Sequence, residues 1–165
     1  MIYRLLLLVY RFLPGPVQAV GVWLIEPKTT VGVAVAAFDD DGRLMLFQHR
    51  YDRPNSPRLP GGHIHAGEHP VAALHRELAE EGGATVELCD LVHIETSHGR
   101  PSRMTLYYAA RLISPPTATT AEITSWQFCA PNELSARMPR DQAVAIARAR
   151  ALLAAAPVAG ERASV

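Results

Sequence analysis

Three glutamates, Glu77, Glu80 and Glu81, constrain this chain more than any other feature of its sequence. Their spacing of i, i+3 and i+4 places all three carboxylates on one face if the segment is helical. Like charges on one face repel and destabilise a helix, so a positive partner should lie among them. A hard divalent cation such as Mg²⁺ suits an all-oxygen cluster, because it prefers carboxylates together with water and substrate phosphates. The spacing therefore predicts a helix with a metal site suited to diphosphate chemistry.

The residues around the three glutamates support a helix. Periodicity begins near Glu68, and the apolar residues Leu74 and Leu78 recur on one face. The pair Gly82 and Gly83 ends the predicted helix, because glycine is a common residue just past a helix C-terminus.

The rest of the chain favours a sheet. Residues 30–38 and 43–48 are strand-like and are separated by a turn that ends in Asp-Gly, which predicts a hairpin. Four further strand-like runs follow the predicted helix, at residues 86–88, 91–96, 104–112 and 123–129. Asp141 can cap a final alanine-rich helix. This order of elements predicts an α/β fold, a mixed sheet with helices on both faces.

Length and charge bound the organisation and the partners. With 165 residues, 48% of them hydrophobic, the chain can form one compact domain. We expect an N-terminal apolar helix or extension over residues 1–16, the main domain over 17–156 and a disordered tail over 157–165. Sixteen basic residues balance sixteen acidic ones, which argues against nucleic acid as a partner. Any anionic ligand must therefore be captured by a local site.

The N-terminal residues 1–13 contain only two charged side chains, Arg4 and Arg11. The segment is too short to span a bilayer, which takes about 20 apolar residues, and Arg11 interrupts the apolar stretch that a signal peptide needs. We expect a helix packed on its own domain or on the second copy of a homodimer, in preference to a helix on a membrane surface. The following valine-containing run, residues 17–25, is predicted to be a strand.

The two cysteines, Cys89 and Cys129, form no C-x-x-C pair. A domain with a good core has no need of a disulfide framework. We therefore expect both cysteines to be reduced and buried, in a cytoplasmic protein.

The stretch from Gly62 to Ala84 resembles the signature of the Nudix hydrolase family, G-x5-E-x7-R-E-U-x-E-E-x-G-U, in which U is a bulky aliphatic residue. Every fixed position is matched, by Gly62, Glu68, Arg76, Glu77, Glu80, Glu81 and Gly83. Leu78 fills the first U, whereas Ala84 is small for the last. The resemblance implies the Nudix fold, an α/β/α sandwich around a central mixed sheet. It also implies a pyrophosphohydrolase that cleaves the diphosphate bond of a nucleoside diphosphate linked to another moiety, by attack of water on phosphorus.

The resemblance also implies roles for individual residues. Glu77, Glu80 and Glu81 would bind Mg²⁺, with Mn²⁺ as an alternative. Arg76 and Glu68 would hold these carboxylates in place. A general base must activate the attacking water, and three candidates remain open. The candidate catalytic residues are therefore Glu77, Glu81 and Glu122, together with Arg76.

Other residues are candidates for substrate binding. Arg50 and Arg58 flank a polar loop and offer forked donors that suit phosphate. The backbone at Gly61 and Gly62, in a Leu-Pro-Gly-Gly turn, would also lie near the substrate and the metal.

Two further hypotheses compete with the hydrolase. One is a catalytically silent module with the Nudix fold that senses a nucleotide derivative, although such modules tend to lose signature carboxylates and this chain keeps them all. The other is a structural protein whose acidic helix face is simply solvated. That second hypothesis does not explain Gly62 and Gly83.

Overall fold

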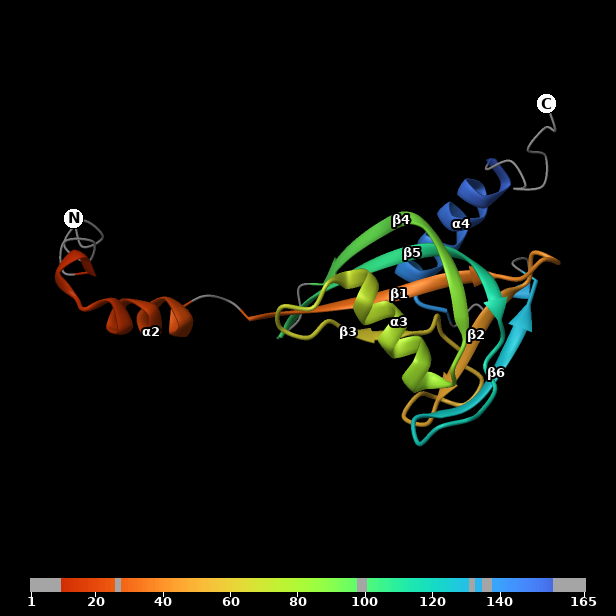
Figure 1. Cartoon of the computed structure of the whole chain (residues 1–165), viewed down its shortest axis with the longest axis horizontal. Helices are drawn as coiled ribbons and strands as arrows, with labels where there is room; N and C mark the ends of the chain where they lie inside the picture. Colours follow the sequence, from red (N-terminus) through yellow and green to blue (C-terminus); the bar gives the residue numbers. More distant parts are fainter. Residues whose placement is uncertain (1–9, 26–27, 98–100, 131–132, 135–137, 156–165) are drawn as a thin grey trace, which may run out of the picture.

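The computed structural model describes residues 10–25, 28–97, 101–130, 133–134 and 138–155 (Figure 1). Its elements in chain order are α2 (Gly15–Ile25), β1 (Thr29–Phe38), β2 (Leu44–His49), β3 (Gly61–His63), α3 (Pro70–Glu81), β4 (Thr85–Ser97), β5 (Ser102–Ser114), β6 (Ile123–Cys129) and α4 (Arg140–Ala155). The predictions for residues 1–9 and for the tail 157–165 lie outside the described residues, and the division of the chain at 16 and 156 stays a prediction.

A six-stranded mixed sheet forms the centre of the domain, in the order β4-β5-β1-β2-β6, with β3 paired to β1. β1 runs parallel to β5 along its whole length, and the other pairs are antiparallel. The predicted hairpin between β1 and β2 is confirmed. In its turn Gly42 adopts φ 73° and the Asp39 N–H donates to the Arg43 carbonyl at 3.0 Å.

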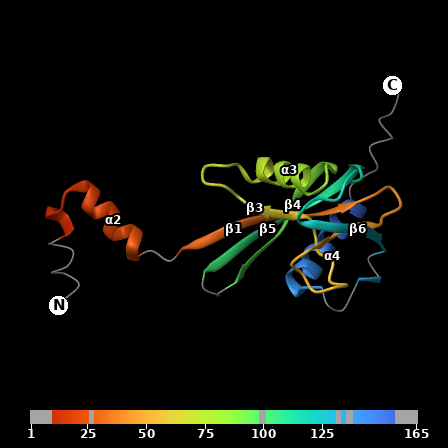
Figure 2. The ribbon, with the colours of Figure 1, turned by 90° about the horizontal axis from the view of Figure 1, so that it is seen from below.

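Alternate residues of β1 supply two separate cores, because successive strand side chains point to opposite faces of the sheet. Val35 and Ala37 pack with Leu74 and Leu78 of α3. The intervening residues Ala34, Ala36 and Phe38 pack with Ala145, Ile146 and Ala149 of α4. Figure 2 shows α3 and α4 on opposite sides of the sheet. The predicted α/β/α arrangement around a mixed sheet is confirmed.

The predicted strand at residues 17–25 is wrong, because this segment belongs to helix α2. Pro16 lies in the first turn of α2, where its missing N–H costs nothing. A strand needs a partner, and the strand nearest in sequence, β1, already pairs with β5 on one side and with β3 and β2 on the other. A helix instead satisfies its backbone hydrogen bonds internally.

Residues 10–25, the part of the N-terminal segment that the structure describes before residue 28, do not pack on the domain. α2 buries none of its residues, and Figures 1 and 2 both show it standing apart from the sheet. The preceding residues Tyr10, Phe12 and Leu13 are 40%, 82% and 36% exposed. The expected packing on the chain's own domain is therefore wrong for the part that the structure describes. Among the described helices, none is long and apolar enough to cross a membrane.

The structure also differs from three smaller predictions, on β4, on Asp141 and on the two cysteines. The runs at residues 86–88 and 91–96 form one continuous strand, β4, with a register irregularity between Leu88 and Asp90. Asp141 lies in the first turn of α4, and its carboxylate accepts a hydrogen bond from the Tyr107 hydroxyl at 2.5 Å. Both cysteines are free, but Cys89 is exposed and Cys129 is only partly buried.

Candidate active site

Helix α3 carries the acidic face. It begins after His69, whose ring Nδ1 accepts from the Val71 N–H at 3.3 Å, and it ends at Gly82, where φ is 152°. Leu74 and Leu78 are fully buried against the sheet, which fixes the rotation of the helix. That rotation turns the glutamates toward the neighbouring Gly-Gly turn.

Arg76 donates hydrogen bonds to three of the signature carboxylates. Its Nε and Nη2 donate to the two oxygens of Glu68, each at 2.9 Å, which makes a bidentate pair. Its Nη1 donates to Glu77 at 2.9 Å and to Glu80 at 3.3 Å. Nη2 also donates to the His63 carbonyl at 2.8 Å, on the segment that follows the glycines. The guanidinium therefore ties α3 to the turn before it and offsets the charge of the acidic face.

Glu68 lies before α3, not within it, and accepts from the His65 N–H at 2.9 Å as well as from Arg76. Hydrogen bonding to Arg76, reinforced by the His65 N–H, lowers the pKa of Glu68 from 4.5 to about 2. The same interaction raises the pKa of Arg76. Both groups are thus held in their charged forms, which keeps Arg76 fixed beside the metal-ligand candidates.

Glu81 is held differently from Glu77 and Glu80. Its side chain is 7% exposed, and its two oxygens accept from His49 Nε2 and from the Gly61 N–H, both at 2.9 Å. Burial raises the pKa of Glu81, while the hydrogen bonds from His49 and Gly61 act in the opposite direction. Glu81 is therefore a positioned carboxylate, with both oxygens directed by neighbouring groups.

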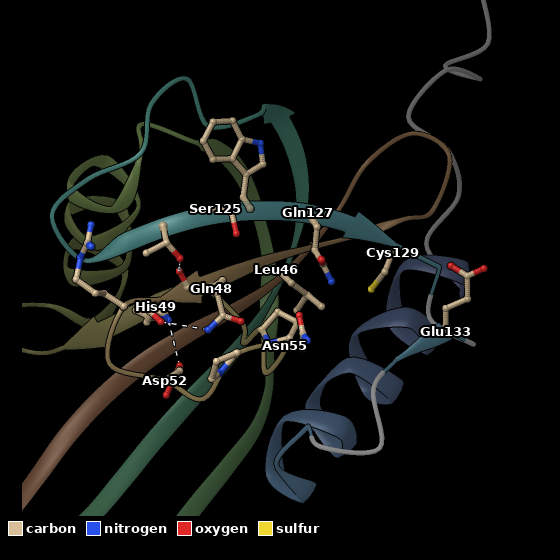
Figure 3. Close-up of a pocket in the computed structure, with 14 residues that line it drawn as sticks. Leu46, Gln48, His49, Asp52, Asn55, Ser125, Gln127, Cys129 and Glu133 are labelled. Atoms are coloured by element: carbon tan, nitrogen blue, oxygen red, sulfur yellow. Dashed lines mark hydrogen bonds and ion pairs between the residues drawn. The ribbon is translucent and has the colours of Figure 1, made fainter.

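His49 extends this arrangement away from the helix. Its Nδ1 lies 3.5 Å from a carboxylate oxygen of Asp52, and Figure 3 shows these two side chains facing each other. The other oxygen of Asp52 pairs with Arg58 at 2.9 Å. His49 and Asp52 are not among the residues predicted from the sequence. No local pattern signals the contact between His49 and Glu81, which are 32 positions apart, and Asp52 joins the site only through His49.

The two glycines of the turn allow close approach. At Gly61, φ is 145° and a Cβ would lie 2.1 Å from the Val33 carbonyl oxygen. At Gly62, a Cβ would lie 2.2 Å from the carboxyl carbon of Glu77. The missing side chain at Gly62 therefore makes the space that the Glu77 carboxylate occupies.

Four carboxylates face one cavity of about 450 Å³. Glu77, Glu80, Glu81 and Glu122 all line it, together with Arg76. A second cavity of about 640 Å³, which Arg58 lines, adjoins the first. Both cavities share four residues, Tyr51, Gly61, Gly62 and His63. The structure thus brings Glu122 to the helix glutamates and places Arg58 in the adjoining cavity.

Arg50 is not brought into these two cavities. Its Nε donates to the Ala121 carbonyl at 2.8 Å. It lines a third cavity of about 550 Å³ beside β2 and β6, which Figure 3 shows with Gln48 and Gln127 on its wall. A phosphate contact by Arg50 remains a prediction, and its position favours a role in holding the segment before Glu122.

The carboxylates fit a hard divalent cation by their chemistry. Oxygen donors of four acidic side chains line one cavity, and the carboxylate of Glu77 occupies the space that the missing Cβ of Gly62 leaves. Within the described residues, no three acidic, histidine or cysteine side chains are grouped closely enough to hold a metal as they stand. Arg76 engages Glu77 and Glu80, and His49 engages Glu81. Glu80, with a side chain 60% exposed, has the most freedom to change its partner.

The fold and this arrangement of residues define a class of α/β/α proteins with an acidic helix packed against a Gly-Gly turn. The family model of the NUDIX domain matches residues 28–149, so the chain belongs to the Nudix family. This membership confirms the family that the signature predicted, a family of hydrolases.

Relatives and solved structures agree with that assignment. A "MutT-like protein" of Streptomyces ambofaciens is 31% identical over 120 residues, which cover 72% of this chain and 75% of that protein. "Nucleoside diphosphate-linked moiety X motif 6" of Xenopus laevis is 36% identical over 86 residues, which cover 50% of this chain and 40% of that protein. This chain thus spans less than half the length of the Xenopus relative.

Among solved structures, a C. elegans Ap4A hydrolase superposes with a TM-score of 0.65 at 20% identity, over 76% of this chain and 98% of that one. The MutT NUDIX hydrolase of Burkholderia pseudomallei gives 0.64 at 20% identity, over 73% and 98%. At such identities the two structures show the fold alone.

Proposed function

We propose that this protein hydrolyses the diphosphate bond of a nucleoside diphosphate linked to another moiety, with Mg²⁺ or Mn²⁺ bound by Glu77, Glu80 and Glu81. The observation that carries the proposal is the cavity in which these glutamates, Glu122 and Arg76 meet. Its junction with the larger cavity supports a substrate that extends beyond its phosphates. Free cysteines support the cytoplasm as its location.

The cation would offset the charge of the diphosphate and make the bridging oxygen a better leaving group. The protein's own residues do the positioning. Arg76 holds Glu77 and Glu80, and His49 together with the Gly61 N–H holds Glu81. Positioning of this kind supplies much of the catalysis in phosphoryl transfer.

Glu77, Glu81 and Glu122 remain the candidates for the general base. Glu122 has a position that differs from the other two. It follows the loop at Thr120, whose hydroxyl accepts from its N–H at 3.3 Å, and it lines the cavity without an ion pair to Arg76. If Glu122 is the base, Glu122→Gln should lower kcat and leave metal affinity unchanged, whereas Glu77→Gln should alter both.

The test is release of phosphate or of a nucleoside monophosphate from a substrate panel with Mg²⁺ or Mn²⁺. The panel includes ADP-ribose, nucleoside triphosphates, nucleotide sugars and dinucleoside polyphosphates. Metal-dependent turnover of one class should fall by on the order of 100-fold or more in Glu81→Gln. Glu87→Gln is the matched control, because Glu87 is an exposed glutamate on β4, outside the cavity.

Three results would contradict the proposal. Turnover without a metal would show that hydrolysis does not require a cation. Equal turnover in Glu81→Gln and the wild type would show that hydrolysis does not require the carboxylates of this cavity. If no compound is cleaved while one of them raises the melting temperature, the chain is a nucleotide-derivative sensor instead.

A further inference from the structure

Apart from Gln18, whose amide donates to two backbone carbonyls that precede the helix, helix α2 is apolar around its whole circumference. The four consecutive residues from Val22 to Ile25 are 39%, 63%, 69% and 85% exposed. An α-helix completes a turn in 3.6 residues, so four consecutive side chains point in all directions around its axis. Val17 and Val20, one turn earlier, are 49% and 56% exposed as well. Large exposed apolar surfaces of this kind mark interaction sites.

Because these apolar side chains lie on all sides of α2, they favour a lipid layer that surrounds the helix over a protein partner that covers one side of it. A second copy of the chain, or a groove on another protein, would cover one side of α2 and leave the other side in water. A lipid layer covers every side of an inserted helix. Eleven residues give a length of about 16 Å, which is too short for a bilayer's hydrocarbon thickness of about 30 Å. α2 therefore suits insertion along one leaflet, with both of its ends near the headgroups.

The residues that flank α2 fit the surface of an anionic bilayer. Lys28 lies over the Trp23 ring at 4.5 Å, and its ammonium group also donates to the Trp23 carbonyl. Tryptophan and lysine are typical of the boundary between hydrocarbon and water. Arg11 is exposed before the helix, and α2 itself contains no charged residue. Over residues 1–28, three basic residues exceed one acidic residue, which favours negatively charged headgroups.

We propose that α2 docks the protein on an anionic lipid bilayer by inserting its apolar side chains into one leaflet. The docking does not depend on the proposed hydrolysis. α2 precedes the start of β1 (Figure 1), whereas Glu77, Glu80 and Glu81 belong to the C-terminal half of α3. Docking through α2 therefore requires no change at Glu77 or Glu81.

The experiment is flotation of the full chain with vesicles of phosphatidylcholine alone and of phosphatidylcholine mixed with phosphatidylglycerol. The wild type should float with the mixed vesicles. The double variant Trp23→Glu/Ile25→Glu should lose about tenfold or more of this binding, because two buried apolar side chains are replaced by charges. The matched control is Ile113→Glu/Val144→Glu, which changes residues that are 68% and 41% exposed on β5 and α4. The control should bind as the wild type does.

Light scattering after size-exclusion chromatography measures the oligomeric state and tests the alternative that a second copy of the chain covers α2. If the wild type is a dimer that does not float, and Trp23→Glu/Ile25→Glu is a monomer, a second copy covers α2 and the proposal is overturned. A wild type that neither floats nor dimerises also overturns it. So does an equal loss of flotation in the control variant. Equal binding to both kinds of vesicle overturns the assignment of anionic headgroups.

Discussion

The two helices α2 and α3 are nearly equal in length, at 11 and 12 residues, but they differ in burial and in charge. α3 buries Ala73, Leu74 and Leu78 on the sheet and directs charged groups into a cavity. α2 has no polar face of comparable strength and buries nothing against the domain. Tertiary packing provides most of the stability of a helix in a protein, so packing on the domain stabilises α3 and does not stabilise α2. Paired substitutions in the two helices test this difference.

The largest expected difference is in stability. Leu78→Ala should lower the free energy of unfolding by about 2–5 kcal/mol, because Leu78 is fully buried and its truncation leaves a cavity. Leu24→Ala in α2 should change it by less than about 0.5 kcal/mol, because Leu24 is 69% exposed. Urea denaturation of both variants measures the two effects. Similar losses would mean that α2 packs on the domain in solution.

The next effect concerns two glycines. Gly62→Ala should lower turnover by about 100-fold, because its Cβ displaces the Glu77 carboxylate. The obstructing atoms are the end of a flexible side chain, so the melting temperature should change less than turnover does. Gly21→Ala in α2 is the control, since a Cβ at Gly21 meets nothing within 4 Å. Comparable turnover in the two variants would show that Glu77 is not needed at its present position.

A smaller effect should follow from Arg76→Lys. Lysine keeps the charge but cannot make the bidentate pair with Glu68 while also contacting Glu77. We expect kcat to fall by about 10–100-fold, in line with the loss of a group that orients metal ligands. Arg11→Lys, before α2, should leave kcat unchanged. An unaltered kcat in Arg76→Lys would show that charge alone suffices at this position.

The smallest effect is a pH dependence at Glu68. Its pKa is lower in the folded chain, at about 2, than its ordinary value of 4.5. The stabilisation that its ionised form provides is therefore complete at pH values well above 4.5, and it is lost as the pH falls toward 2. The difference in unfolding free energy between the wild type and Glu68→Gln should shrink over this range. A difference that stays constant with pH would exclude the ion pair with Arg76 as its source.

The two helices also differ in how far their secondary structure could be predicted from the sequence. Local periodicity was sufficient for α3, because its glycines, its apolar spacing and its glutamates all indicate the same element. In α2 the valines favoured a strand, but strand formation depends on a free neighbouring edge, which the sequence does not reveal. Sheet order is a property of the whole chain.

In the candidate site, too, some contacts could be predicted from the local sequence and others depend on the whole fold. Glu68, Glu77 and Glu80 lie around Arg76, and Glu122 reaches the same cavity as the helix glutamates from a distant loop. His49 was not predictable, because its contact with Glu81 depends on where β2 ends relative to α3. Arg58 was expected to meet phosphate, yet its observed partner is Asp52, a neighbour within the same loop.

The most direct test of the central claim, that the acidic face of α3 binds a divalent cation, is a Mn²⁺ titration followed by electron paramagnetic resonance. The wild type should bind Mn²⁺, Glu81→Gln should bind it at least about tenfold more weakly, and Glu87→Gln should match the wild type. Equal affinity in the wild type and Glu81→Gln, or the same loss in Glu87→Gln, would contradict the account.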